Sequence, residues 1–120
     1  MRMTHGQALK AYTTIIGLRK RAKERTAYFL FRLKEELKPL VDFQAEEEMK
    51  LIEKYDGKVN EMGFVMIEDD EKREAFLKEK EELARMVIDP EITPVKINPE
   101  KIADINIEEI EALSGFVNFE

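Results

Sequence analysis

The sequence predicts an α+β domain that is mostly α: a long antiparallel helical hairpin, a small two-stranded β element at or near its tip, and a C-terminal helix. Residues 18–56 keep a nearly unbroken helical pattern, residues 68–88 repeat it, and the stretch between them is rich in strand formers. The 120 residues are enough for one domain. We expect a hairpin over about 18–88 and a C-terminal appendix over 89–120.

A short helix is expected before the hairpin. Thr4 and Gln7 have the spacing of a capping box, in which each side chain binds the backbone N–H of the other residue. The helix begins near residue 5 in this interpretation. It bends or breaks near Gly17, because glycine costs roughly 1 kcal/mol in a helix interior.

The long helix carries apolar residues at steps of three and four. They form two stripes, one before Pro39 and one after it: Leu18, Ala22, Phe29, Leu33, Leu37 and Leu40, then Val41, Ala45, Met49, Ile52 and Tyr55. Pro39 lacks an N–H to donate to Glu35, so we expect a kinked but continuous helix; two helices with a one-residue joint are the alternative. Gly57 is expected to end the helix in left-handed geometry.

The segment after this helix changes character. Gly63 is a turn residue, and residues 64–67 are a short apolar run of strand formers. They predict a small hairpin or a single strand, which could pair with the extended residues 92–97. The acidic run 68–71 then begins a returning helix, because carboxylates cap free N–H groups there. That helix is expected to reach about Ile88, with a narrow buried stripe of Phe76, Leu83 and Val87.

The C-terminal appendix shows two further helix starts. The Asn-Pro pair at 98–99 predicts one short helical turn. Asn106 and Glu109 have capping-box spacing, which predicts a last helix over residues 107–114 that Gly115 ends. The tail 116–119 is too apolar to remain in water, so we expect it to dock on the hairpin or on a partner.

Catalytic and metal-binding patterns are absent from the sequence. There is no cysteine, and His5 is the single histidine, which excludes thiol chemistry and sites rich in histidine. Ser114 has no histidine placed to activate it, and no phosphate-binding glycine pattern occurs. The carboxylates of residues 68–70 could hold Mg²⁺ or Ca²⁺, but helix capping explains them more simply. We therefore expect no cofactor, no metal and no enzymatic activity.

The same composition bears on location. No apolar run approaches the roughly 20 residues of a membrane-spanning helix. The first residues lack a hydrophobic signal core, so a cytoplasmic protein is expected.

Charge is distributed unevenly along the chain. Residues 1–40 carry ten Lys and Arg against three Glu, whereas residues 41–120 carry ten against twenty-three Asp and Glu. Such asymmetry is typical of a surface for nucleic acid or an acidic partner. It is also expected where the two halves pack on each other, or on the opposite half of a second copy, and we favour this second interpretation.

The basic segment 19–25 is the main candidate for an interaction site. In a helix, its like charges spaced four residues apart would repel one another, which suggests a nearby anion. The aromatic residues that follow could stack on bases, although their spacing also fits core packing. The candidate interaction residues are Arg19, Lys20, Arg21, Lys23, Arg25, Tyr28, Phe31, Phe116 and Phe119.

The order of features resembles a group of small proteins encoded by tailed phages and prophages. The resemblance rests on the basic and aromatic first part, the EEEMKLIEKY segment at 46–55, Gly63 with Phe64, Phe76 with Leu83, and the LSGF segment at 113–116. It implies phage origin and a role in virion assembly or host takeover, and no catalytic residue. The helix–hairpin–helix order is also similar to prefoldin-type chaperone subunits, which lack so long a C-terminal appendix.

These observations predict a non-enzymatic interaction protein that acts through helical surfaces, as a virion assembly factor, a chaperone or an inhibitor of a host protein. Its partner would be another protein, of phage or host, in the host cytoplasm or the virion. A nucleic-acid-binding accessory protein that uses residues 19–25 is the alternative. A homodimer or larger oligomer is expected, because a long helix with stripes on changing faces buries poorly alone.

Overall fold

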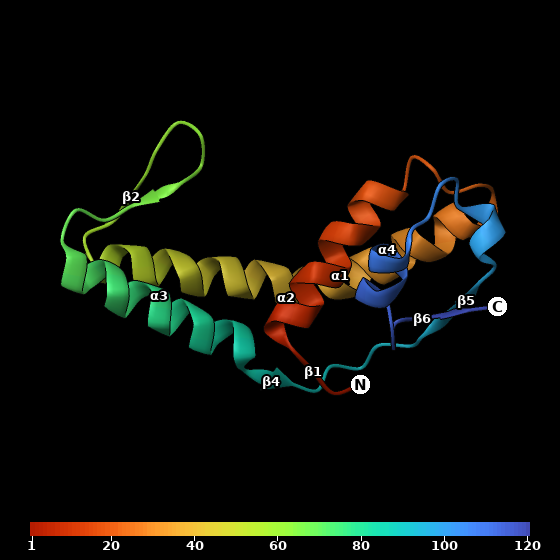
Figure 1. The fold of residues 1–120 in the computed structure, drawn as a ribbon. Helices are drawn as coiled ribbons and strands as arrows, with labels where there is room; N and C mark the ends of the chain where they lie inside the picture. The colour runs from red at the N-terminus through yellow and green to blue at the C-terminus, as the bar shows by residue number, and fades with distance from the viewer.

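The computed structural model describes residues 1–120 and confirms the α+β, mostly α architecture (Figure 1). The elements follow one another as β1 (Met3–Thr4), α1 (His5–Leu18), α2 (Arg25–Lys54), β2 (Lys58–Val59), β3 (Val65–Met66), α3 (Asp70–Arg85), β4 (Val87–Ile88), β5 (Val95–Ile97), the 3-10 turn η1 (Pro99–Lys101), α4 (Ile107–Ala112) and β6 (Val117–Phe119). The molecule measures 49 × 30 × 22 Å.

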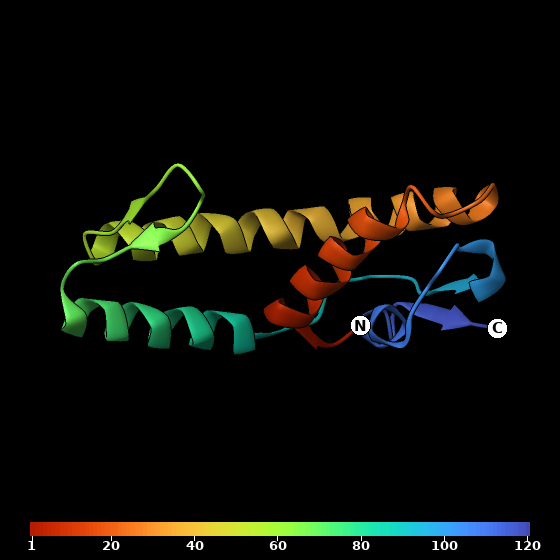
Figure 2. The ribbon, with the colours of Figure 1, turned by 45° about the horizontal axis from the view of Figure 1, so that its top comes forward.

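Two parts make up this elongated shape. The head consists of residues 1–40 and 89–120, with α1, the first half of α2 and the C-terminal elements. The arm consists of residues 41–88, with the second half of α2, α3 and the β2–β3 hairpin (Figure 2). Fifteen buried residues form the head core, whereas the tip of the arm buries only Ile52, Ile67 and Phe76, which we call the tip cluster. Most of the buried apolar surface that stabilises the fold therefore lies in the head.

Helix α1 begins as its sequence predicts. The amide of Gln7 donates to Thr4 Oγ1 over 3.1 Å, and the amide of Thr4 donates to Gln7 Oε1 over 2.9 Å. The helix continues past Gly17 and ends at Leu18.

The long helix does not begin at Leu18, as the sequence predicted, but at Arg25. Residues 19–24 form a connection that pairs with the C-terminal part of the chain: the amide of Lys23 donates to the carbonyl of Lys101, and that of Ala103 to the carbonyl of Arg21. These partners lie about 80 residues away in the sequence, so no local pattern reveals them. The repulsion among neighbouring cations also disfavours a helix here.

Helix α2 is continuous over 30 residues with Pro39 inside it, so the predicted continuity through Pro39 is confirmed and the alternative, a joint between two helices, is wrong. Of the first apolar stripe, Leu33 and Leu37 are fully buried in α2 as predicted. Leu18 and Ala22 lie outside this helix, because Leu18 ends α1 and Ala22 is in the connection. Of the second stripe, Ile52 is buried, but Ala45 and Met49 are exposed.

The helix end also differs from the prediction. Asp56, not Gly57, adopts the positive φ, of 55°. Space at Gly57 is tight, because a Cβ atom on it would lie 3.0 Å from Ile67 Cγ1 and 3.2 Å from Ile52 Cγ2. The glycine therefore lets the chain turn tightly over the tip cluster.

The predicted hairpin is confirmed. Strands β2 and β3 pair in antiparallel fashion, and the loop between them is held by Asn60 Oδ1, which accepts from the amides of Met62 and Phe64, each over 2.9 Å. Gly63 takes a φ of 85° in this loop. The predicted alternative, in which residues 64–67 pair with residues 92–97, is wrong, because β5 pairs in parallel with β6.

Helix α3 packs antiparallel to α2 and is shorter than predicted (Figure 2). Asp69 caps it, with its side chain accepting from the amide of Lys72 over 3.0 Å. Phe76 and Leu83 are buried as expected, but the helix ends at Arg85. Val87 leaves the predicted buried stripe, because β4 extends to pair with β1 and exposes it.

The C-terminal predictions are largely confirmed. Asn98 caps η1, and Asn106 and Glu109 form the capping box of α4. The tail docks in the head, where Phe116 and Val117 join the core that includes Leu30, Leu33 and Leu37 of α2, and β6 pairs with β5. Phe116 is 4% exposed within the head core, so its prediction as an interaction residue is corrected.

Candidate functional site

The tip of the arm carries a group of exposed apolar side chains, which we call the tip surface: Val59, Met62, Phe64, Met66 and Leu77. Met62 is 80% exposed and Phe64 60%. Successive strand residues point to opposite faces, so the hairpin turns Ile67 onto the tip cluster and leaves Met66 outside. No other part of the chain covers the outer face of the hairpin (Figure 1).

A groove of about 310 Å³ lies beneath the hairpin. Phe64 and Leu77 line it, together with Phe76 of the tip cluster. Glu48 and Lys80 cross its edge as an ion pair between α2 and α3, with 3.2 Å between carboxylate and ammonium. The tip surface is therefore an apolar surface with a hollow, held between two helices.

The surroundings of the tip surface are acidic. Residues 53–74 carry eight carboxylates and four basic side chains. Two ion pairs fix this region, Lys54 with Glu79 over 2.9 Å and Lys72 with Asp56 over 2.6 Å. The hydrogen bond and charge of Lys72 lower the pKa of Asp56, and the hydrogen bond from Lys54 lowers the pKa of Glu79.

The opposite end of the molecule carries the predicted cations, and the structure divides them into two kinds. Arg21 is a structural residue: it forms an ion pair with Glu109 and donates to the carbonyls of Ala103 and Asp104 over 3.1 and 3.0 Å. The other four, Arg19, Lys20, Lys23 and Arg25, are exposed and form no ion pair.

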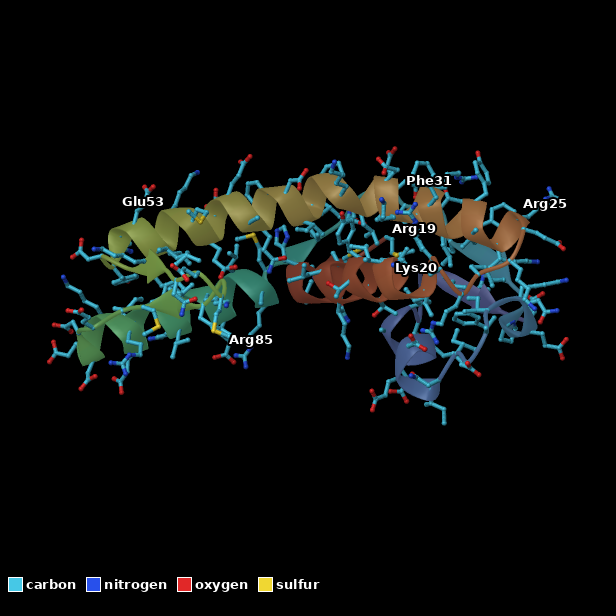
Figure 3. The ribbon with its side chains drawn as sticks, turned by 90° about the horizontal axis from the view of Figure 1, so that it is seen from above. Arg19, Lys20, Arg25, Phe31, Glu53 and Arg85 are labelled. Carbon is cyan, nitrogen blue, oxygen red and sulfur yellow. The ribbon has the colours of Figure 1, made fainter.

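Two exposed aromatic side chains lie near Arg19 and Arg25. Tyr28 and Phe31 are 59% and 42% exposed, and they share one face of α2 with Arg25 because they follow it at steps of three. The Arg19 guanidinium carbon lies 5.9 Å from the Phe31 ring centroid, and Lys34 Nζ lies 5.5 Å from it, in cation–π contacts (Figure 3). We call the six residues Arg19, Lys20, Lys23, Arg25, Tyr28 and Phe31 the head surface.

Part of the charge asymmetry is resolved within the head. Residues 89–120 carry eight acidic against two basic side chains and pack with the basic residues 1–40. This arrangement agrees with the interpretation that the two halves of the chain pack on each other. The arm, residues 41–88, keeps fifteen acidic against eight basic side chains, and nothing in the chain neutralises that excess.

The remaining candidates do not form a site. Phe119 is half-buried in β6, and Phe116 is inside the head core. No three acidic or histidine side chains converge as metal ligands would. His5 is buried and stacks on Phe43, with 5.6 Å between ring centroids. None of the helices combines the length and the apolar character needed to cross a membrane.

The tip surface was missed by sequence reasoning, although a signal was present. The sequence pattern predicts a strand over residues 64–67 and assigns no role to Met62. A two-stranded hairpin has two faces, and this chain supplies only the tip cluster to cover one of them. Apolar residues on both faces therefore indicate an exposed surface.

Comparison with protein-family models, with curated proteins and with solved structures finds no match for this chain. The resemblance to small phage proteins therefore stays a prediction.

Proposed function

We propose that this chain is a non-enzymatic protein-binding module whose arm presents the tip surface to a partner protein. One observation carries the proposal: five large apolar side chains are exposed together at the end of an arm that projects from the head. Folded chains rarely leave several large apolar side chains exposed in one region unless that region binds something. Methionine suits such a role, because its flexible, polarisable side chain adapts to different partner shapes.

The charge around the tip surface favours a protein over a membrane or a nucleic acid. An anionic lipid surface and a phosphate backbone would both be repelled by the carboxylates of residues 53–74. A protein segment with an apolar anchor side chain flanked by Lys or Arg satisfies both the groove and the acidic surroundings. The proposed partner is therefore a protein segment with an apolar anchor side chain between Lys or Arg residues.

The phage resemblance adds detail to this proposal. It implies that the partner is a virion component or a host protein, and that binding serves virion assembly, chaperoning or inhibition. The proposed location is then the host cytoplasm or the virion.

A selection from a displayed library of random peptides tests the proposal. We expect selected peptides to combine an apolar anchor with flanking Lys or Arg. They should bind the double variant Phe64→Ser, Leu77→Ser at least tenfold more weakly, since a central apolar anchor contributes about 2 kcal/mol or more. The matched control is Ile107→Ser, which removes a 73% exposed apolar side chain from the head. Peptides that bind the tip variant as well as they bind the control would refute the proposal.

Nucleic-acid binding through the head surface is the second candidate function. The observation that favours it is the group of four cations without ion pairs beside two exposed aromatic rings. The net charge of −6 and the acidic arm oppose it. Binding of a single-stranded oligonucleotide that falls steeply as salt is added would support it, and absent or salt-independent binding would exclude it.

A further inference from the structure

We infer that the partner of the tip surface is the head surface of a second copy of this chain, in an antiparallel dimer with two-fold symmetry. This inference rests on the proposed function and names the partner of the same site.

The two surfaces complement each other in chemistry. The tip surface offers apolar side chains and a groove within acidic surroundings. The head surface offers two exposed aromatic rings within a group of cations. The head surface thus has the composition deduced above for the partner segment, an apolar anchor flanked by Lys and Arg.

The two surfaces are also placed so that one symmetric contact can use both. The loop between β2 and β3 and the connection between α1 and α2 rise on the same side of α2, at opposite ends of the molecule (Figures 1 and 3). A two-fold rotation that faces these sides together brings each tip onto the head of the other copy. Both contacts then form at once, which closes the assembly at two copies.

Electrostatics supports the same arrangement. Arg19, Lys20, Lys23 and Arg25 have no carboxylate partner in their own chain, and the arm has an excess of carboxylates. In the dimer, the four unpaired cations of each head surface lie near the carboxylates on the arm of the other copy. Lys34 and Arg19 hold the Phe31 ring by cation–π contacts, so the aromatic anchor is partly ordered before binding.

Charge reversal in two variants tests the inference. The head variant is Lys20→Glu, Lys23→Glu, and the tip variant is Glu61→Lys, Glu68→Lys; all four side chains are exposed and form no ion pair. The control is Lys10→Glu, Lys96→Glu, which makes the same charge change as the head variant elsewhere on the head. Sedimentation velocity measures the mass of each, and circular dichroism verifies that each is folded.

We expect the wild type and the control to sediment as a dimer, at twice the 14.1 kDa of one chain. Each reversed variant alone should dimerise at least about tenfold more weakly, because like charges face each other in both contacts. An equimolar mixture of the two variants should dimerise again, since the acidic head then meets a basic tip and the basic head meets an acidic tip. A structural defect in either variant would not be repaired by mixing.

The other outcomes overturn the inference. A wild-type monomer at tens of micromolar, or a dimer that neither variant weakens, would do so. A mixture of the two variants that stays monomeric would also overturn the inference. So would a monomeric wild type that binds a single-stranded oligonucleotide, if the head variant does not bind it. The proposed function fails separately, when the library selection finds no peptide that depends on Phe64 and Leu77.

Discussion

Replacing Phe76 by Ala is predicted to open the tip of the arm while the head stays folded. Phe76 is 3% exposed and is one of only three buried residues in the tip cluster. Burial of each large apolar side chain contributes about 1.5–3 kcal/mol, so the cluster supplies about 5–9 kcal/mol before entropy is subtracted. A buried Phe→Ala substitution costs about 3–5 kcal/mol, roughly half of that total.

The head does not share this loss, because its core of fifteen residues contains no member of the tip cluster. Alanine is also a good helix former, so the effect does not come from weakening α3 itself. Native-state hydrogen exchange is the suitable assay. The amides of Gly57 and Asn60, which donate to the carbonyls of Ile52 and Phe64, should exchange about 100-fold faster or more.

Two amides in the head serve as the reference. Those of Val95 and Ala103 donate to the carbonyls of Phe116 and Arg21, and their exchange should change little. The control variant is Leu77→Ala, which removes an exposed side chain next to Phe76 and should shift stability by no more than about 0.5 kcal/mol. Equal acceleration at tip and head would refute the division into two cores, since the whole chain would then unfold as one unit.

Three further predictions concern single contacts. Lys72→Met should raise the pKa of Asp56 toward its ordinary 3.8 in an NMR titration, because the hydrogen bond and charge of Lys72 lower that pKa in the folded chain. The pair therefore stabilises the fold above pH 3.8, and this stabilisation is lost as pH falls through the lower folded-state pKa of Asp56. An unchanged titration of Asp56 in the variant would contradict the contact. Gly57→Ala should lower the free energy of unfolding of the tip by about 1–3 kcal/mol, because the added methyl group would crowd Ile67 and Ile52 of the tip cluster. A neutral effect in hydrogen exchange would show that the turn relaxes. A double-mutant cycle of Arg21→Met and Glu109→Gln, measured by denaturant unfolding, should give a coupling energy of about 1 kcal/mol, since this ion pair is only partly exposed. Additive effects of the two substitutions would show that the ion pair contributes nothing to stability.

The sequence was most informative where a few neighbouring residues decide the structure. Thr4 with Gln7, Asn106 with Glu109 and the acid at Asp69 all cap the helices they were predicted to cap. In each case, donor and acceptor are within four residues of each other. Local chemistry therefore sets these helix starts, whatever the rest of the chain does.

Where distant segments compete with local preference, the sequence was misleading. Ala22 has the helical spacing of the apolar stripe, yet it pairs with Ile102 and leaves the helix. Val87 continues the helical spacing of Phe76 and Leu83, yet it lies in β4, which pairs with β1. In each case the chain pairs with a segment about 80 residues away, which no periodicity can reveal.

The candidate site was predicted only in part. The cations of the head surface follow from composition, but the distinct role of Arg21 depends on Glu109, which only the fold brings near. The tip surface depends on what covers a hairpin, and that is a property of the whole chain.

Photo-crosslinking from position 64 tests the central claim most directly. A benzophenone side chain replaces Phe64 in a mixture of isotopically light and heavy chains, and mass spectrometry identifies the partner of each crosslink. We predict crosslinks between chains, from position 64 to residues 19–31 of the second copy. The β2–β3 hairpin and the start of α2 belong to opposite halves of a molecule 49 Å long, so we expect no such crosslink within one chain. Crosslinks confined to single chains, or crosslinks between chains that end elsewhere than on the head surface, would contradict the account.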